Sequence, residues 1–184
     1  QGIKWLEIEG SDSDHIYDAK QVVYHVNGLP SFSENPIHKG QHLVVIGAGN
    51  VAVDVTHWAV QQNVPEITWL VRRGPNQVKY TDKEIGYVGA HVDRDQLREE
   101  IQRIGKQLVQ IGEDPEETRD RIEAPLGDTP IPDSQSVIRM RFACQANRIH
   151  ADARGNIASI EVVENELYLQ NDRIGCRSTT ETTT

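Results

Sequence analysis

A glycine-rich turn at residues 47–52 is the first place where residue types and spacing point to chemistry. Its sequence, Gly-Ala-Gly-Asn-Val-Ala, has the G-x-G-x-x-A form found where a strand passes into a helix against a dinucleotide. The first glycine permits a tight exit from the strand, the second lets the backbone approach a pyrophosphate, and the last alanine keeps the helix close to the sheet. The first amides and the dipole of that helix favour an anion. We therefore predict that a pyrophosphate is held by Gly47, Ala48, Gly49, Asn50 and Val51.

Two adjacent arginines, Arg72 and Arg73, follow about twenty residues later. NAD sites usually carry Asp or Glu at this place for the ribose 2′-hydroxyl, whereas NADP sites use arginine to meet the 2′-phosphate. Two guanidiniums offer forked donors to a phosphate. We expect a preference for NADPH over NADH of about 2–4 kcal/mol, roughly 30- to 1000-fold. The alternative interpretations are an ordinary structural turn and a solvated arginine pair at a strand end.

These residues need a strand, a helix and a second strand to bring them together. The apolar run at residues 43–46 is typical of a buried parallel strand. The pattern of residues 50–62 predicts an amphipathic helix, and residues 66–71 are expected to form the next strand. The other predicted elements are a helix at 18–26, a third parallel strand at 89–92, an amphipathic helix at 95–112, a helical turn at 114–122, and extended runs at 136–149, 157–169 and 173–177.

A few other residues are weaker candidates for contacts with a nucleotide. Residues 81–84 have the form of a capping box, in which Thr81 and Glu84 each accept from the other's backbone amide. Lys79 could add charge near a phosphate, but we expect it to be solvated. Asn50 could cap the helix, bind the pyrophosphate, or do both. No histidine, cysteine or carboxylate spacing predicts a metal site, and no residue is a convincing acid, base or nucleophile, so no catalytic residue is assigned.

Two stretches carry a family resemblance: VVIGAGNVAVDV at residues 44–55 and WLVRRGPNQVKYTDKE at residues 69–84. Together they resemble the NADP-binding domain of the adrenodoxin-reductase type of ferredoxin–NADP reductase and, more loosely, the small subunit of glutamate synthase and related flavoproteins. The run at residues 16–30 is similar to the helix and N-G-x-P turn that precede the nucleotide strand in those proteins. Residues 136–142 and 159–167 resemble their antiparallel β-meander. The resemblance extends over residues 5–169.

The resemblance implies an α/β fold, a Rossmann-like three-layer parallel sheet with an antiparallel β-meander. It implies an FAD- and NADP-dependent oxidoreductase, in which hydride passes between NADPH and FAD and electrons pass on to an iron–sulfur partner. Ferredoxin and the large subunit of glutamate synthase remain open as acceptors. By the same resemblance Glu84 contacts the adenosine ribose. One departure is that Thr56 and His57 stand where Ala and Arg are common in the family.

The family's N-terminal FAD-binding turn, G-x-G-P-A-G, and its returning strand do not occur in this sequence. We therefore expect a segment of a longer enzyme, lacking the last strand of its sheet, with FAD bound mostly outside it and no turnover of its own. An open sheet edge would allow pairing into a homodimer. The alternatives are a non-catalytic NADP(H)-binding module or subunit and a flavin-independent NADPH dehydrogenase. The predicted divisions are a lead-in and crossover helix (1–40), a nucleotide-binding core with a helical insertion (41–135), a β-meander (136–178) and a frayed tail (179–184).

The amino-acid composition disfavours some classes of binding partner. Lys and Arg number 19 against 28 Asp and Glu, a net charge of −9, which disfavours nucleic acid and anionic membranes. The length suits one domain, and no apolar run approaches the roughly 20 residues that span a bilayer. The two distant cysteines, Cys144 and Cys176, fit reduced thiols, and we expect a cytoplasmic protein.

Overall fold

A parallel sheet lies at the centre of the molecule. The computed structural model describes residues 6–32, 34–37 and 41–183. Three parallel strands, β1 (His42–Ile46), β2 (Glu66–Val71) and β3 (Val137–Phe142), lie in the order β1-β2-β3. β2 is the central strand, and its side chains are mostly buried, because a central parallel strand is covered on both faces.

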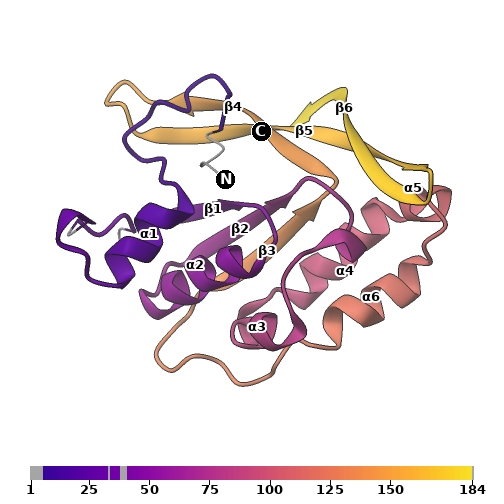
Figure 1. Cartoon of the computed structure of the whole chain (residues 1–184), viewed down its shortest axis with the longest axis horizontal. Helices are drawn as coiled ribbons and strands as arrows, with labels where there is room; N and C mark the ends of the chain where they lie inside the picture. Colours follow the sequence, from indigo (N-terminus) through magenta and orange to yellow (C-terminus); the bar gives the residue numbers. More distant parts are fainter. Residues whose placement is uncertain (1–5, 33, 38–40, 184) are drawn as a thin grey trace.

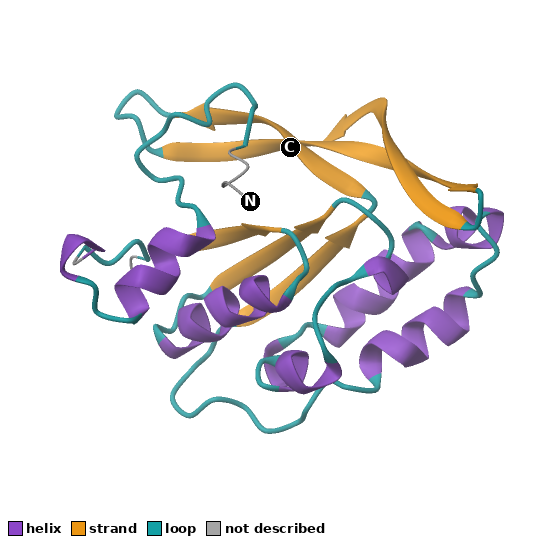
Figure 2. Cartoon of the chain, viewed as in Figure 1, coloured by secondary structure: helices purple, strands orange, loops and turns teal. Residues whose placement is uncertain are grey.

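The two crossovers of this sheet place helices on one face. α2 (Asn50–Gln61) joins β1 to β2, and the insertion between β2 and β3 contains α4 (Arg94–Arg103), α5 (Gly105–Gln110) and α6 (Pro115–Glu123). Right-handed crossovers that step in one direction along a sheet put their helices on the same side. Figure 2 shows this helical layer on one side of the parallel sheet and a second sheet on the other.

The second sheet is an antiparallel meander of β4 (Cys144–Ala151), β5 (Ile157–Gln170) and β6 (Arg173–Thr183), in that order. The chain leaves β3 and enters β4 at Ala143, which has a φ of 49° and is fully buried. This left-handed residue turns the backbone from one sheet into the other. The molecule is therefore three-layered, with helices, a parallel sheet and a meander, and the predicted α/β fold class is confirmed (Figure 1).

The predicted limits of the meander were wrong at both ends. β3, expected in the meander, pairs in parallel with β2, from Glu66 opposite Val137 to Val71 opposite Phe142. It resembles a half-exposed strand in sequence because it is an edge strand whose arginines face away from the helices. The tail expected to fray from residue 179 instead continues β6, with Thr183 paired to Val162. Threonine is β-branched and favours such pairing.

The insertion also differs in detail from the sequence prediction. Residues 89–92 do not form a third parallel strand. They contain η3 (Gly89–His91), a 3-10 turn, and Val92 makes only an isolated bridge to Ile138. A Cβ at Gly89 would lie 2.6 Å from the backbone nitrogen of Gly127, so this turn packs too closely for an ordinary strand residue. The helix expected over 95–112 is interrupted at Ile104, although its apolar stripe is buried throughout.

The remaining helices are short, and two of them, α1 (Ala19–Val26) and α3 (Asp82–Gly86), begin with a side-chain cap. α1 confirms the helix expected at residues 18–26. Its N-cap is Asp18, whose side chain accepts from the amides of Lys20 and Gln21, and Gly28 follows the helix with a φ of 69°. η1 (Pro30–Phe32) and η2 (Pro75–Gln77) complete the set. Of the expected lead-in, residues 1–5, 33 and 38–40 lie outside the described residues. Within the described ranges, no helix is both long and apolar enough to cross a membrane.

Candidate functional site

The glycine-rich turn adopts the geometry that its sequence predicts. Gly47 follows β1 with a φ of 123°, a backbone conformation that residues with a Cβ rarely adopt. Its amide donates to the carbonyl of Leu70 on β2 at 3.0 Å. Gly49 is the N-cap of α2 and offers no side chain to cap it. The first turn of α2 therefore lacks a side-chain acceptor at the place where its dipole favours an anion.

The segment after β2 folds back over this turn. The amide of Lys79 donates to the carbonyl of Ala48 at 2.7 Å, and Gly49 and Lys79 form an isolated parallel bridge. A Cβ at Gly49 would lie 3.9 Å from the Cβ of Lys79. Both sides of this bridge line a cavity of about 1500 Å3 between the two sheets, which includes residues 47–52. Lys79 is exposed, in agreement with its expected solvation, and it places a positive charge beside the turn.

The arginine pair is held by its backbone. The carbonyl of Arg72 accepts from the side-chain amide of Asn165 at 2.9 Å, and the carbonyl of Arg73 accepts from the amide of Ala143 at 2.9 Å. Arg72 is exposed and Arg73 is half-buried. In the described part of the chain neither guanidinium has a hydrogen-bond or ion-pair partner. The backbone of the arginine pair is therefore fixed at the end of β2, while the side-chain donors stay available to a ligand.

The turn and the arginine pair lie at the same edge of the sheet, because β1 and β2 are parallel and each site follows the carboxyl end of its strand. They do not share one cavity. The glycine turn lines the cavity between the sheets, whereas Arg73 lines a smaller hollow near the β5–β6 hairpin and Arg72 lines neither. A ligand that used both would extend across the edge of the sheet, as a dinucleotide does.

Glu84 is placed differently from the capping-box prediction. Thr81 does cap α3, since its hydroxyl accepts from the amide of Glu84 at 3.3 Å. The reciprocal bond is absent among the described residues, because the amide of Thr81 donates instead to Oδ1 of Asn50 at 2.9 Å. Asn50 thereby joins the first turn of α2 to the start of α3. Among the described residues the Glu84 carboxylate has no hydrogen-bond or ion-pair partner.

No protein-family model matches the chain. The NADPH:adrenodoxin oxidoreductase of Drosophila melanogaster, a mitochondrial protein, is 32% identical over 102 residues, covering 44% of this chain and 22% of that protein. The resemblance to adrenodoxin reductase is confirmed. Two structures of Mycobacterium tuberculosis FprA, one in complex with NADPH and one with a covalently modified NADP+, match with a TM-score of 0.70 at 21% identity.

The FprA matches cover 98% of this chain and 44% of FprA, and at this identity they concern the fold alone. The chain thus spans less than half the length of the proteins it matches.

The departure from the adrenodoxin-reductase pattern at Thr56 has a structural explanation. Thr56 is fully buried on α2, and its hydroxyl accepts from the indole nitrogen of Trp69 on β2 at 2.8 Å. A buried indole N–H needs such an acceptor. His57 stacks on Tyr87 with ring centroids 5.9 Å apart. Both residues therefore pack the helix against its neighbours, which the sequence did not reveal because the contacts are non-local.

Two buried titratable groups lie near the site. Desolvation raises the pKa of Tyr80 to about 12, and its hydroxyl has no partner among the described residues. Burial likewise raises the pKa of Cys144 to about 11. Both stay protonated at neutral pH, so neither supplies a nucleophile. Within the described ranges, no cluster of three or more histidine, cysteine or carboxylate side chains could hold a metal ion.

Proposed function

We propose that this chain is the NADP(H)-binding domain of a flavin-dependent oxidoreductase. The observation that carries the proposal is the arrangement of Gly47, the uncapped start of α2, and an unpaired arginine pair at the same sheet edge. The residues fit the cofactor, because a left-handed glycine and a capless helix start leave room for a pyrophosphate next to backbone amides.

In this proposal the pyrophosphate lies on Gly47, Ala48, Gly49, Asn50 and Val51. Arg72 and Arg73 meet the 2′-phosphate, and Glu84 accepts from the adenosine ribose. The Glu84 carboxylate has no partner in the described part of the chain, and the bond from Thr81 to Asn50 ties the start of its helix to the first turn of α2, which supports this role. Lys79 adds a positive charge beside the pyrophosphate. The contribution of this chain is to bind and orient the nucleotide.

The whole protein's activity is part of the same proposal. FAD, bound mostly outside this segment, would accept hydride from NADPH and release electrons to an iron–sulfur protein such as ferredoxin. The similarity to an NADPH:adrenodoxin oxidoreductase and to an oxidoreductase in complex with NADPH supports the nicotinamide side of this reaction. We further propose a cytoplasmic location, in line with two free cysteines, and a homodimer formed through an exposed sheet edge.

Calorimetric titration of the chain with NADPH and NADH tests the binding proposal. We expect NADPH to bind roughly 30- to 1000-fold more tightly than NADH. Replacing both arginines, Arg72→Gln with Arg73→Gln, should remove most of that preference and leave the affinity for NADH unchanged. Equal affinities of the unaltered chain for the two nucleotides would refute the assigned role of the arginine pair.

The two alternative functions give different results with the same chain. A flavin-independent dehydrogenase would oxidise NADPH in the presence of small aldehydes or ketones without added flavin. A non-catalytic module would bind NADPH but would not reduce FAD when joined to the rest of its gene product. Binding of NADPH without carbonyl reduction, together with flavin reduction by the longer protein, is the result that we expect.

A further inference from the structure

Most arginine side chains of the molecule have an acidic or carbonyl partner, and two of those without one among the described residues lie at the same small surface. Nine of the thirteen arginine side chains contact a carboxylate or a backbone carbonyl. In a chain of net charge −9 such pairing is expected. The arginines without a side-chain partner in the described part of the chain are Arg72, Arg73, Arg154 and Arg173.

Two of these four face the same hollow. Arg73, at the end of β2, and Arg173, at the start of β6, line a depression of about 450 Å3. The other lining residues belong to the β5–β6 hairpin and include the ring of Tyr168 and the side-chain amides of Gln170 and Asn171. Every polar side chain of this lining can donate a hydrogen bond, and no carboxylate is among them.

The hairpin holds Arg173 in a defined position. Asn171 and Asp172 form its two-residue turn with φ values of 50° and 57°, the left-handed pair of a type I′ turn. Arg173 pairs with Gln170, so both side chains leave the same face of the hairpin. Two residues further along each strand, and on the same face, Tyr168 pairs with Gly175.

Gly175 accounts for the shape of the hollow. A Cβ there would lie 2.4 Å from the ring of Tyr168, so the ring lies directly against the backbone of β6. Glycine at this position leaves the ring as one wall of the hollow. The nearest acidic groups on this side of the hairpin do not oppose an anion strongly, because Glu166 is paired with Arg177 and Asp172 is exposed at the tip.

The hairpin is also docked against the corner that carries Arg73. The neighbouring Gly74 is buried, and a Cβ there would lie 3.2 Å from the side chain of Leu167 on β5. The amide of Leu167 donates to the side chain of Gln107 on α5 at 2.8 Å, and Asn165 on the same strand donates to the carbonyl of Arg72. The backbones of Arg73 and Arg173, one hundred positions apart in sequence, are therefore fixed beside one hollow.

We propose that this hollow binds a dianionic phosphate group, with Arg73 and Arg173 as the cationic residues of its lining. Two guanidiniums, two carboxamides and a phenol provide forked and single donors suited to a dianionic phosphoryl group. The phosphate has two possible sources, the 2′-phosphate of NADP(H) and free phosphate. The first source rests on the proposed function and makes Arg173 a specificity-determining residue of the meander. The second source is independent of it.

Calorimetry on the whole chain and on two variants tests the site. Arg173→Gln removes one guanidinium of the hollow, and Arg154→Gln is the matched control, because Arg154 is equally unpaired but lies in the β4–β5 turn outside the lining. The probes are 2′-AMP, 5′-AMP, NADPH, NADH and orthophosphate. Circular dichroism spectra establish that both variants are folded, and Arg173→Lys reports whether charge alone restores binding.

If the 2′-phosphate occupies the hollow, Arg173→Gln should weaken 2′-AMP and NADPH by about 5- to 30-fold and leave 5′-AMP and NADH unchanged. If free phosphate occupies it, Arg173→Gln should weaken orthophosphate by a similar factor while NADPH is unaffected. Arg154→Gln should change neither. Unchanged affinities of Arg173→Gln for both 2′-AMP and orthophosphate would overturn the site. Failure of the unaltered chain to bind NADPH would refute the proposed function alone, because the orthophosphate titration would still decide the site.

Discussion

The contact between Thr56 and Trp69 shows how one side chain can depart from a family pattern without serving the ligand. The hydroxyl and the indole are both fully buried, and their 2.8 Å hydrogen bond links α2 to the central strand. A threonine at this position is explained by its tryptophan partner. It needs no role in binding a nucleotide.

Thr56→Val should therefore lower the free energy of unfolding by about 1–3 kcal/mol, because it keeps the side-chain shape but leaves the indole N–H unsatisfied. Urea denaturation of the purified variant measures the change. Thr129→Val, at an exposed position without a described partner, is the control and should cost nearly nothing. A double variant with Trp69→Phe should lose less than the sum of the single changes, and strict additivity would contradict the coupling.

The two cysteines should differ in reactivity. Burial raises the pKa of Cys144 to about 11, whereas Cys176 is only half-buried. A raised pKa keeps the thiol protonated, and the thiolate is the reactive form. At pH 8 the native chain should release one equivalent of thionitrobenzoate from Ellman's reagent quickly, and two in denaturant. Cys176→Ser should abolish the fast phase. A second fast equivalent in the native chain would contradict the burial of Cys144.

At the scale of elements, the corner after β2 is shaped by the meander. Asn165 is fully buried on β5, and its side-chain amide is bonded to the carbonyl of Arg72. Its own amide donates to the carbonyl of Ala143 at 2.7 Å, and the amide of Ala143 donates to Arg73. A strand that is remote in sequence therefore positions the backbone of both arginines.

Asn165→Ala should lower the free energy of unfolding by about 1–2 kcal/mol, because the part-buried carbonyl of Arg72 loses its donor. If the arginines select the 2′-phosphate, the same change should also reduce the preference for NADPH over NADH severalfold while the affinity for NADH is kept. Urea denaturation and calorimetry measure the two effects. Loss of affinity for both nucleotides in equal proportion would instead mean that Asn165 supports the fold without tuning specificity.

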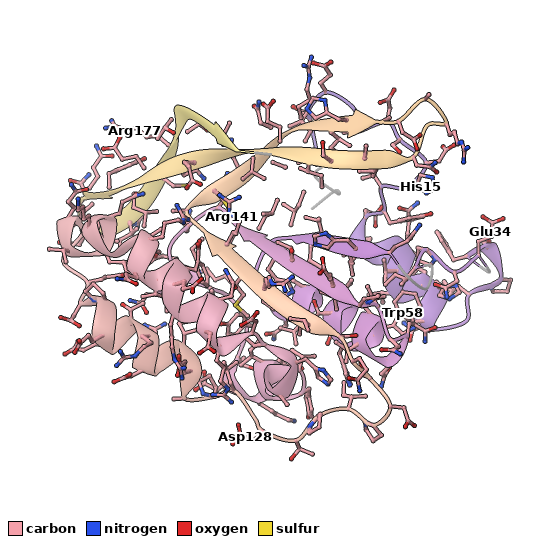
Figure 3. The ribbon with its side chains drawn as sticks, turned by 180° about the vertical axis from the view of Figure 1, so that it is seen from behind. His15, Glu34, Trp58, Asp128, Arg141 and Arg177 are labelled. Atoms are coloured by element: carbon pink, nitrogen blue, oxygen red, sulfur yellow. The ribbon has the colours of Figure 1, made fainter. Side chains whose placement is uncertain are left out.

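At the scale of the whole molecule, one ionic network joins all three layers. Glu100 on α4 is buried, accepts from the backbone amide of Phe142 at 2.6 Å and forms a bidentate pair with Arg103. Arg103 also bonds to Glu164 on β5 at 2.6 Å, and Glu164 bonds to Arg141 on β3 at 2.7 Å. Figure 3 shows Arg141 between the end of β3 and the meander. The hydrogen bonds that Arg103 donates to Glu100 hold the pKa of Arg103 above its ordinary value.

Glu100→Gln should lower the free energy of unfolding by about 2–4 kcal/mol, because it removes one charge from a partly buried network and leaves Arg103 without its bidentate carboxylate. Asp120→Asn, which breaks the exposed pair with Arg119, should cost less than about 1 kcal/mol. Urea denaturation of the two variants gives the comparison. Equal losses would show that burial of the network has no energetic consequence.

The sequence alone determined the features whose causes are local. The turn at residues 47–52 was predictable because its glycines are needed for the local backbone conformation, and Gly47 indeed has a positive φ. β1, α2 and β2 were predictable from short apolar runs and helical spacing. The division into a helical face and a meander followed from the resemblance to adrenodoxin reductase.

Only the tertiary structure decided which segments meet. β3 alternates in sequence like a meander strand, and its parallel pairing with β2 could not be read from that alternation, because periodicity describes the faces of a strand and not its partner. The amide of Thr81 donates to Asn50 and not to Glu84, and Lys79 lies beside the glycine turn. Arg173 lines the same hollow as Arg73. Such contacts join residues tens of positions apart, and they depend on the packing of whole layers that no local pattern encodes.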